Sequence, residues 1–231
     1  MIMIKEDRIN ITAHAGCMNT KMDSIESVES GIKNGADIIE IDLNIKDGRL
    51  ILSHDIPKDN MEYEKFEKVL DIMNKYGNAE LNIDVKDVSV LEALKDMILK
   101  YELMDRIFLT GLTYENISDN KEKLYGFRYL VNLDESDLKR IFISGNSRNL
   151  DDFGLKKISD SKAIGVNLNY KLISSDIEIA EEFRKRDFQV HVWTVDKLED
   201  MKKLLKYNIN SITTNKVDLL KECINSYCQY K

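Results

Sequence analysis

The sequence predicts an α/β fold, and more specifically a (β/α)8 TIM barrel that occupies residues 1–231 as a single domain. Short segments rich in Val, Ile and Leu alternate with segments of helical periodicity, a pattern typical of parallel β–α units. The length of 231 residues is close to the roughly 250 residues typical of such barrels. A doubly wound open sheet is the alternative, but no glycine-rich phosphate loop follows the first expected strand.

The expected barrel strands are short, and helical segments separate them. They are RINITAH (8–14), ADIIEIDL (36–43), AELNIDVK (79–86), RIFLTGL (106–112), FRYLVNL (127–133), AIGVNLNY (163–170), FQVHVWTV (188–195) and NSITTN (210–215). A further extended piece, RLILSH (49–54), follows the turn sequence KDG. The chain has a single proline and no Gly/Ser tract, so no linker divides it.

Helical periodicity fills the intervals between the strands. In the first helix, 24–35, Ile25, Val28 and Ile32 share one face, and Asn34-Gly35 forms a plausible C-terminal cap. The other expected helices cover 62–77, 90–101, the segment after Thr113, 135–142, 176–186, 197–207 and 217–227.

Composition restricts the partners and the compartment. The net charge of −7, from 34 Lys+Arg against 41 Asp+Glu, gives no electrostatic support for binding nucleic acid. An anionic ligand would need a metal ion or a few well-placed cations to overcome the acidic field. The three cysteines are odd in number, and no apolar run approaches the roughly 18–20 residues of a membrane span. We therefore expect a cytoplasmic protein with no membrane span, and the oligomeric state is left open.

Acidic residues interrupt the second strand in a regular way. Because side chains alternate between the faces of a strand, Ile38, Glu40 and Asp42 point to one side, opposite an unbroken aliphatic face. Neighbouring carboxylates repel one another unless a cation lies between them. Asp84 occupies the polar face of the next barrel strand, so three oxygen ligands from adjacent strands predict a site for one divalent cation, Mg²⁺ or Ca²⁺. Solvated surface carboxylates are the alternative, but parallel strands are normally buried.

Other polar residues fall at or near strand ends, where the catalytic face of a barrel lies. His14 and His54 end extended segments that flank the acidic strand, and a histidine pair can divide the work of general acid and general base. Lys86 shares a face with Asp84 and could hold a phosphate oxygen, although a simple ion pair is the alternative. His191 is expected to line the barrel interior without a catalytic role.

Seven segments carry a specific resemblance. They are AHAG (13–16), NGADIIEIDL (34–43), KDG (46–48), SHD (53–55), LNIDVK (81–86), VHVWTVD (190–196) and SITTNKVDLL (211–220). In order and spacing they resemble the motifs of the glycerophosphodiester phosphodiesterases. In that family a His-Arg-Gly strand end precedes a Gly-Ala-Asp-x-Ile-Glu-x-Asp strand, a Lys-Asp-Gly turn and a His-Asp pair. The block 34–55 is the most specific part.

The resemblance implies a TIM barrel that cleaves a small phosphodiester substrate with one divalent ion. By this carry-over Glu40, Asp42 and Asp84 hold the metal, and His14 and His54 act as acid and base. Lys86 would steady the phosphate, and Trp193 would form a wall of the pocket. The expected reaction converts a glycerophosphodiester to an alcohol and glycerol 3-phosphate. A substrate hydroxyl attacks the phosphorus to form a cyclic phosphate, which water then opens.

The chain also departs from the family pattern. Ala15 replaces the arginine that follows the first histidine, and Asp23-Ser24-Ile25 replaces Glu-Asn-Thr. Asp84 is shorter than the usual glutamate and gives an Asp-x-Lys motif that resembles sphingomyelinase D-type relatives. Asn215 stands where aspartate is usual. Only 26 residues separate His54 from Leu81, where many relatives insert a small lid.

Three alternatives remain beside glycerophosphodiester hydrolysis. The open site suggests a sphingomyelinase D- or lysophospholipase D-like phosphodiesterase acting on longer head-group substrates. Ala15 suggests a barrel that binds a phosphorylated ligand without turning it over, although both histidines are retained. An unrelated metal-assisted barrel chemistry, such as an aldolase or isomerase, is the third.

Overall fold

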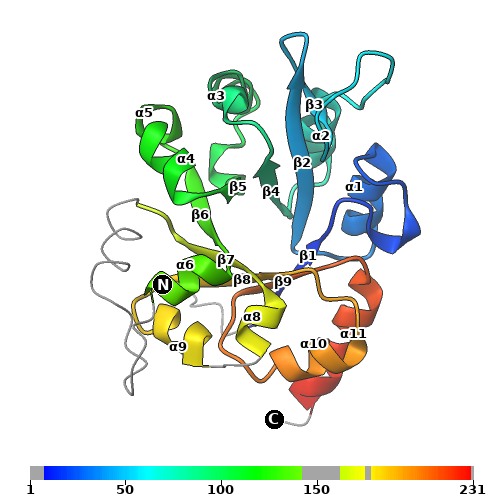
Figure 1. Cartoon of the computed structure of the whole chain (residues 1–231). Helices are drawn as coiled ribbons and strands as arrows, with labels where there is room; N and C mark the ends of the chain where they lie inside the picture. Colours follow the sequence, from blue (N-terminus) through cyan, green and yellow to red (C-terminus); the bar gives the residue numbers. More distant parts are fainter. Residues whose placement is uncertain (1–7, 142–161, 175–177, 230–231) are drawn as a thin grey trace, which may run out of the picture.

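The predicted barrel is present. The structure, a computed structural model, describes residues 8–141, 162–174 and 178–229. Eight parallel strands follow one another in the order β1-β9-β8-β7-β6-β5-β4-β2, and pairing of Thr12 with Ile38 closes β1 onto β2. Figure 1 shows the helices arranged around the outside of this sheet. The barrel strands are β1 (Asn10–Ala13), β2 (Ile38–Lys46), β4 (Glu80–Val85), β5 (Ile107–Leu112), β6 (Arg128–Leu133), β7 (Gly165–Asn169), β8 (Gln189–Trp193) and β9 (Ser211–Thr214).

The ninth strand, β3 (Arg49–Leu52), forms a hairpin with the extended end of β2. Asp47 and Gly48 both have positive φ values, 49° and 71°, as the type I′ turn of a two-residue hairpin requires. Because β3 runs antiparallel to β2, the chain returns toward the acidic residues. Ser53 N donates to the backbone carbonyl oxygen of Asp42 at 3.1 Å. His54, the next residue, is therefore held close to Asp42.

The helices form the outer layer. α1 (Ile25–Lys33) begins after Ser24, whose hydroxyl accepts a hydrogen bond from the Ser27 amide. The expected helix 62–77 is the shorter α2 (Phe66–Lys75), which packs its apolar face against α1 and β3. It therefore belongs to the helical layer. The others are α3 (Leu91–Lys100), α4 (Tyr114–Asp119), α5 (Lys121–Leu124), α6 (Glu135–Ile141), α8 (Tyr170–Ser174), α9 (Glu178–Arg184), α10 (Leu198–Leu204) and α11 (Val217–Gln229), with 3-10 turns at Cys17–Asn19, Val88–Val90 and Met104–Arg106.

Some of the expected helices extend beyond the described residues. The expected residue 142 and residues 176–177 lie outside them. Within the described ranges, no helix is long and apolar enough to cross a membrane.

Two separate apolar clusters hold the barrel. The larger one lies between the strands and the helices, where the aliphatic face of each strand was expected to pack. The smaller one, inside the barrel, consists of Ile38, Phe108 and Leu130, with Ile164 packed against it. His191 is buried beside it, with its ring edge-on to Phe108 at 5.4 Å between centroids. This apolar floor leaves the polar inward positions closer to the carboxyl ends of the strands.

Candidate active site

A pocket of about 430 Å³ lies inside the barrel at the carboxyl ends of the strands. All seven residues that the sequence singled out contribute to its lining: His14, Glu40, Asp42, His54, Asp84, Lys86 and Trp193. These residues come from β2, β4, β8 and the segments that follow β1, β3 and β4. Their predicted convergence at one end of the barrel is therefore present in the structure.

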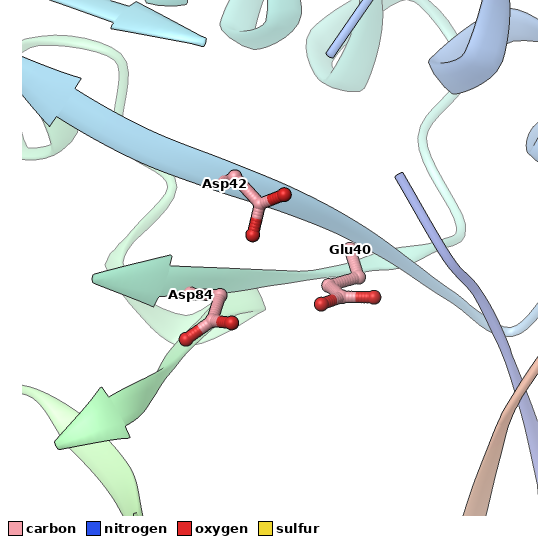
Figure 2. A group of neighbouring side chains, drawn as sticks. All are labelled: Glu40, Asp42 and Asp84. Carbon is pink, nitrogen blue, oxygen red and sulfur yellow. The ribbon is translucent and has the colours of Figure 1, made fainter. Parts of the chain in front are cut away.

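The acidic residues form one compact cluster. Asp42 pairs with Asp84 in the register of β2 and β4, and Glu40 lies two residues earlier on the same face. One oxygen atom from each of the three carboxylates can be chosen so that all three atoms lie within 4.8 Å of one another; Figure 2 shows the three side chains. Each residue has one buried oxygen without a hydrogen-bond partner: Glu40 Oε2, Asp42 Oδ2 and Asp84 Oδ1. Three hard oxygen donors that lack partners suit a divalent cation such as Mg²⁺ or Ca²⁺.

Burial makes this cluster electrostatically costly without a cation. Desolvation raises the pKa of Glu40 well above its usual value, and the neighbouring Asp84 and Asp42 raise it further. Desolvation also raises the pKa of Asp84, although Lys86 opposes the shift. Both shifts reflect the cost of burying negative charge, which a bound cation would offset.

Lys86 lies between two of the acids. Its Nζ is 2.8 Å from Asp84 Oδ2 and 2.9 Å from Asp42 Oδ1, and its side chain is 20 % exposed. Burial alone would lower the pKa of Lys86, but the two carboxylates outweigh that effect and raise it. The ammonium is therefore held charged in the pocket. The single ammonium of Lys86 can neutralise only one of the three carboxyl groups, so the cluster still has room for further positive charge.

A close backbone approach supports Asp84. Gly111 has a φ of +79°, and a Cβ atom at this position would press on Asp84 Oδ1 and lie 2.5 Å from the carbonyl oxygen of Val85. Real Cβ atoms do not approach other atoms so closely. Only glycine, therefore, lets β5 pass this close to the acidic cluster.

His14 is oriented by residues from the far end of the chain. Its Nδ1 lies 3.0 Å from Asn215 Oδ1, and Asn215 Nδ2 donates to Asp196 Oδ2 at 2.8 Å. A carboxylate can only accept, so Asn215 must present its amide nitrogen to Asp196 and its oxygen to His14. Nδ1 of His14 consequently carries the hydrogen, and Nε2 of a neutral ring keeps its lone pair.

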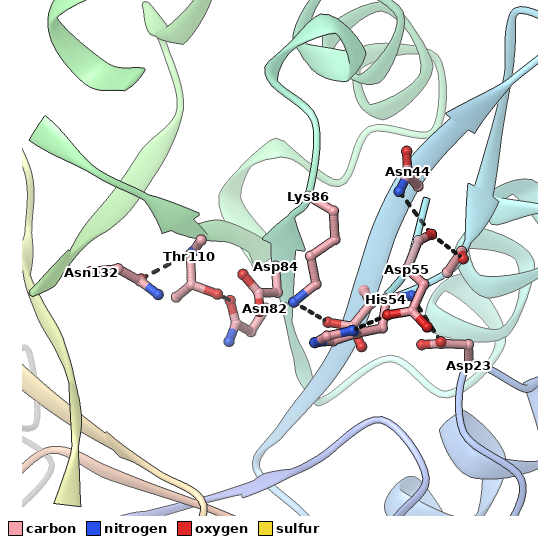
Figure 3. Close-up of polar contacts among 12 residues, drawn as sticks. Asp23, Asn44, His54, Asp55, Asn82, Asp84, Lys86, Thr110 and Asn132 are labelled. Carbon is pink, nitrogen blue, oxygen red and sulfur yellow. Dashed lines mark hydrogen bonds and ion pairs between the residues drawn. The ribbon is translucent and has the colours of Figure 1, made fainter. Parts of the chain in front are cut away.

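His54 has a different setting at the pocket mouth. Its Nδ1 is 2.9 Å from Asp55 Oδ1, and its backbone amide donates to Asp23 Oδ2 at 2.9 Å (Figure 3). Sequence reasoning assigned no role to Asp23. Burial and the adjacent Asp42 raise the pKa of Asp23 to about 6. Asp23 lies between His54 and Asp42 because of the conformation of the loop before α1. No pattern in the sequence predicted that conformation.

The remaining wall of the pocket is neutral. Trp193 contributes a buried Nε1 that has no hydrogen-bond partner. Asn82, Asn132 and Asn167 also line the pocket, and sequence reasoning gave them no role. Strand alternation could have identified two of them as pocket residues, because Asn132 and Asn167 lie on the faces of β6 and β7 opposite the aliphatic residues.

Comparison with known proteins identifies the family. The sequence model of the glycerophosphoryl diester phosphodiesterase family matches residues 56–219 of this chain. The chain belongs to this family. As a family member it is a phosphodiesterase of the glycerophosphodiester class. The matched stretch includes Asp84, Lys86 and Trp193, whereas His14, Glu40, Asp42 and His54 precede it.

Solved structures of glycerophosphodiester phosphodiesterases share this fold. One from Parabacteroides distasonis has a TM-score of 0.76 at 17% identity, with 96% of this chain and 98% of that chain covered. One from Agrobacterium tumefaciens has a TM-score of 0.74 at 15% identity, with 93% and 100% covered. An Oleispira antarctica phosphodiesterase, solved in complex with the product sn-glycerol-3-phosphate, has a TM-score of 0.73 at 11% identity, with 94% and 96% covered. No curated protein matches the sequence.

Proposed function

We propose that this phosphodiesterase hydrolyses glycerophosphodiesters to an alcohol and glycerol 3-phosphate, with one divalent cation held by Glu40, Asp42 and Asp84. The observation that carries the proposal is the convergence of three unpaired, buried carboxylate oxygens in the pocket that also contains two histidines and a charged lysine. Mg²⁺ or Ca²⁺ is the proposed ion, because all three donors are oxygens. When bound, the ion would polarise the phosphoryl oxygens and stabilise their charge.

The histidines divide the proton transfers. Nε2 of His14 accepts the proton of a substrate hydroxyl as that hydroxyl attacks the phosphorus, because the Asn215 contact keeps the hydrogen on Nδ1. His54 gives a proton to the oxygen of the departing alcohol, which leaves a cyclic phosphate. Water then opens the ring, His54 takes a proton from the water, and His14 returns its proton to the ring oxygen. Lys86 supplies a fixed positive charge near the phosphate oxygens.

A lysophospholipase D- or sphingomyelinase D-like activity is the second candidate, and one observation favours it. A cleft of about 560 Å³ adjoins the pocket at Val85, Lys86 and Gly111. Apolar side chains from the β2–β3 region and the loop after it line part of this cleft, among them Ile45 and Ile56. A longer, less polar substituent on the phosphate could occupy it.

The cellular location is part of the proposal. Cys17, Cys223 and Cys228 are all unpaired, which agrees with a reducing cytoplasm. The substrate would then be a soluble or membrane-released diester inside the cell.

Product release from glycerophosphocholine tests the function. We expect glycerol 3-phosphate to form with Mg²⁺ or Ca²⁺, to stop with EDTA, and to fall by about 100-fold or more in His54→Ala. Asn60→Ala, an exposed residue in the same loop, serves as the control variant and should retain wild-type turnover. Stabilisation by the diester without its consumption would instead identify a binding protein. Consumption of lysophosphatidylcholine in preference to glycerophosphocholine would identify the second candidate.

A further inference from the structure

We infer that Asn82, Asn132 and Asn167, here called the carboxamide wall, together with Trp193 bind an uncharged hydroxylated group of the substrate. The wall lies on β4, β6 and β7, and all three carboxamides line the catalytic pocket. The inference rests on the proposed function only in taking the ligand to be a phosphodiester. It adds which part of that ligand lies against which side of the barrel.

Neighbouring groups fix the orientation of two of these amides. Asn132 Oδ1 accepts from Gly111 N at 3.0 Å and from Asn167 Nδ2 at 3.3 Å. Asn82 Oδ1 accepts from the Thr110 hydroxyl at 2.9 Å. The amide nitrogens of Asn82 and Asn132 are therefore turned away from these contacts and point toward the barrel interior (Figure 3). Neither nitrogen has a hydrogen-bond partner among the described residues.

The free atoms on this wall form a mixed set of donors and an acceptor. Asn82 and Asn132 offer Nδ2 donors, Trp193 offers its buried, unpaired Nε1, and Asn167 retains an Oδ1 acceptor. A hydroxyl group both donates and accepts, so a group with two or more hydroxyls can satisfy several of these atoms at once. An acyl chain would leave them all unpaired and buried, which is costly.

The charged groups of the pocket come from other strands than Asn132, Asn167 and Trp193. The carboxylates, Lys86 and both histidines come from β1–β4 and the segments after them, and Asn82 on β4 pairs with Glu40 of β2, whereas the part of the carboxamide wall on β6 and β7 is neutral. A quaternary ammonium or a second phosphate would find no counter-charge against it. The polyol part of the diester accordingly faces β6–β8. The other substituent on the phosphate then points outward, toward the apolar cleft beside Ile56.

The fixed positions of the amides make them suited to discrimination. Asn82 and Asn167 are 5 % and 9 % exposed and sit within strands, so they cannot swing to other partners without disturbing the sheet. A site built to bind a hydroxyl rejects an analogue without one more strongly than an apolar site can reject an extra hydroxyl. The carboxamide wall should therefore contribute to kcat/KM for polyol substrates alone.

Asn167→Leu tests the inference with little change in side-chain volume. It removes the acceptor and leaves the Asn132–Gly111 hydrogen bond, which lies close to Asp84, in place. We expect kcat/KM for glycerophosphocholine to fall about tenfold, while the 2-hydroxyethyl ester of phosphocholine, which keeps the hydroxyl that attacks the phosphorus but lacks the second one, changes by less than about twofold. Asn169→Ala, on the same strand but outside the pocket lining, should change neither. An equal loss with both diesters, or no loss with either, would overturn the inference.

A binding measurement separates this inference from the proposed function. If no diester is turned over, the proposed function fails, and calorimetry with glycerol 3-phosphate and with inorganic phosphate then tests the wall. We expect the wild type to bind glycerol 3-phosphate more tightly than inorganic phosphate, and Asn167→Leu to lose most of that difference. Equal binding of the two anions by the wild type would reject the carboxamide wall as a polyol site.

Discussion

Gly111 offers a direct test of how the barrel shapes the acidic cluster of Glu40, Asp42 and Asp84. In Gly111→Ala the new methyl group would press on the Asp84 carboxylate and come within 2.5 Å of one backbone oxygen and 2.9 Å of one backbone nitrogen of Val85. The methyl group, the strand or the carboxylate must move by an appreciable fraction of an ångström. Metal sites tolerate ligand displacements of only about 0.2 Å, so we expect a weaker site.

The magnitude can be separated into two parts. Alanine at the φ of +79° found at Gly111 costs about 1–2 kcal/mol because the left-handed region is unfavourable for a residue with a Cβ. Overpacking against Asp84 and Val85 adds about 1–3 kcal/mol. Gly126 has a similar φ of +93°, but no atom lies within 4 Å of the place that a methyl group would take there, so Gly126→Ala carries the first cost alone.

The assay combines stability with metal affinity. In urea unfolding with EDTA, Gly111→Ala should be less stable than Gly126→Ala by about 1–3 kcal/mol. In calorimetric titration with Mg²⁺ or Ca²⁺, Gly111→Ala should bind about 10- to 100-fold more weakly than the wild type, and Gly126→Ala should bind normally. Equal stability of the two variants together with unchanged metal affinity would refute this account of the cluster.

Three further predictions concern the titratable groups of the barrel. Asn215→Leu removes the acceptor that orients His14, so kcat should fall about 10- to 100-fold with metal affinity unchanged by calorimetry; an unaltered kcat would show that the contact is dispensable. Folding raises the pKa of Asp23 from 3.8 to about 6, which contributes stability below pH 4 that is lost as the pH rises through 6. In EDTA, the free energy of unfolding of the wild type should therefore fall from pH 4 to pH 7 by about 1–2 kcal/mol more than that of Asp23→Asn, after solvent screening is allowed for. The same pH dependence of stability in both proteins would contradict this. Burial lowers the pKa of His191 from 6.5 to about 3, so its contribution is present above pH 6.5 and is lost as the pH falls. In urea unfolding, the free energy of unfolding of the wild type should fall between pH 6.5 and 4 by about 3 kcal/mol more than that of His191→Phe, for a variant that folds normally at pH 7. If the two proteins lose the same free energy over this range, His191 is not a neutral buried imidazole.

The sequence by itself determined the fold class and most of the charged wall of the pocket. Alternation along β2 and β4 requires Glu40, Asp42 and Asp84 to face one side, and the carboxyl ends of parallel strands share one end of a barrel. These are local rules, so they apply before any tertiary contact is known. The same rule, which was not applied to Asn132 and Asn167, would have put them on the inward face, although their chemical use depends on what else lines the pocket.

Only the tertiary structure decided how the functional groups are oriented. Closure of β1 against β9 brings Asn215 to His14, from which 201 positions separate it in the sequence, and thereby selects the tautomer of the imidazole. The hairpin of β2 and β3 returns His54 to Asp42, and a bend of the chain before α1 sets Asp23 between them. Gly111 is required because β5 passes within contact distance of Asp84. Alternation specifies the face of a strand to which a side chain belongs, but distances across the barrel depend on strand register and closure, which arise only when all eight strands pair.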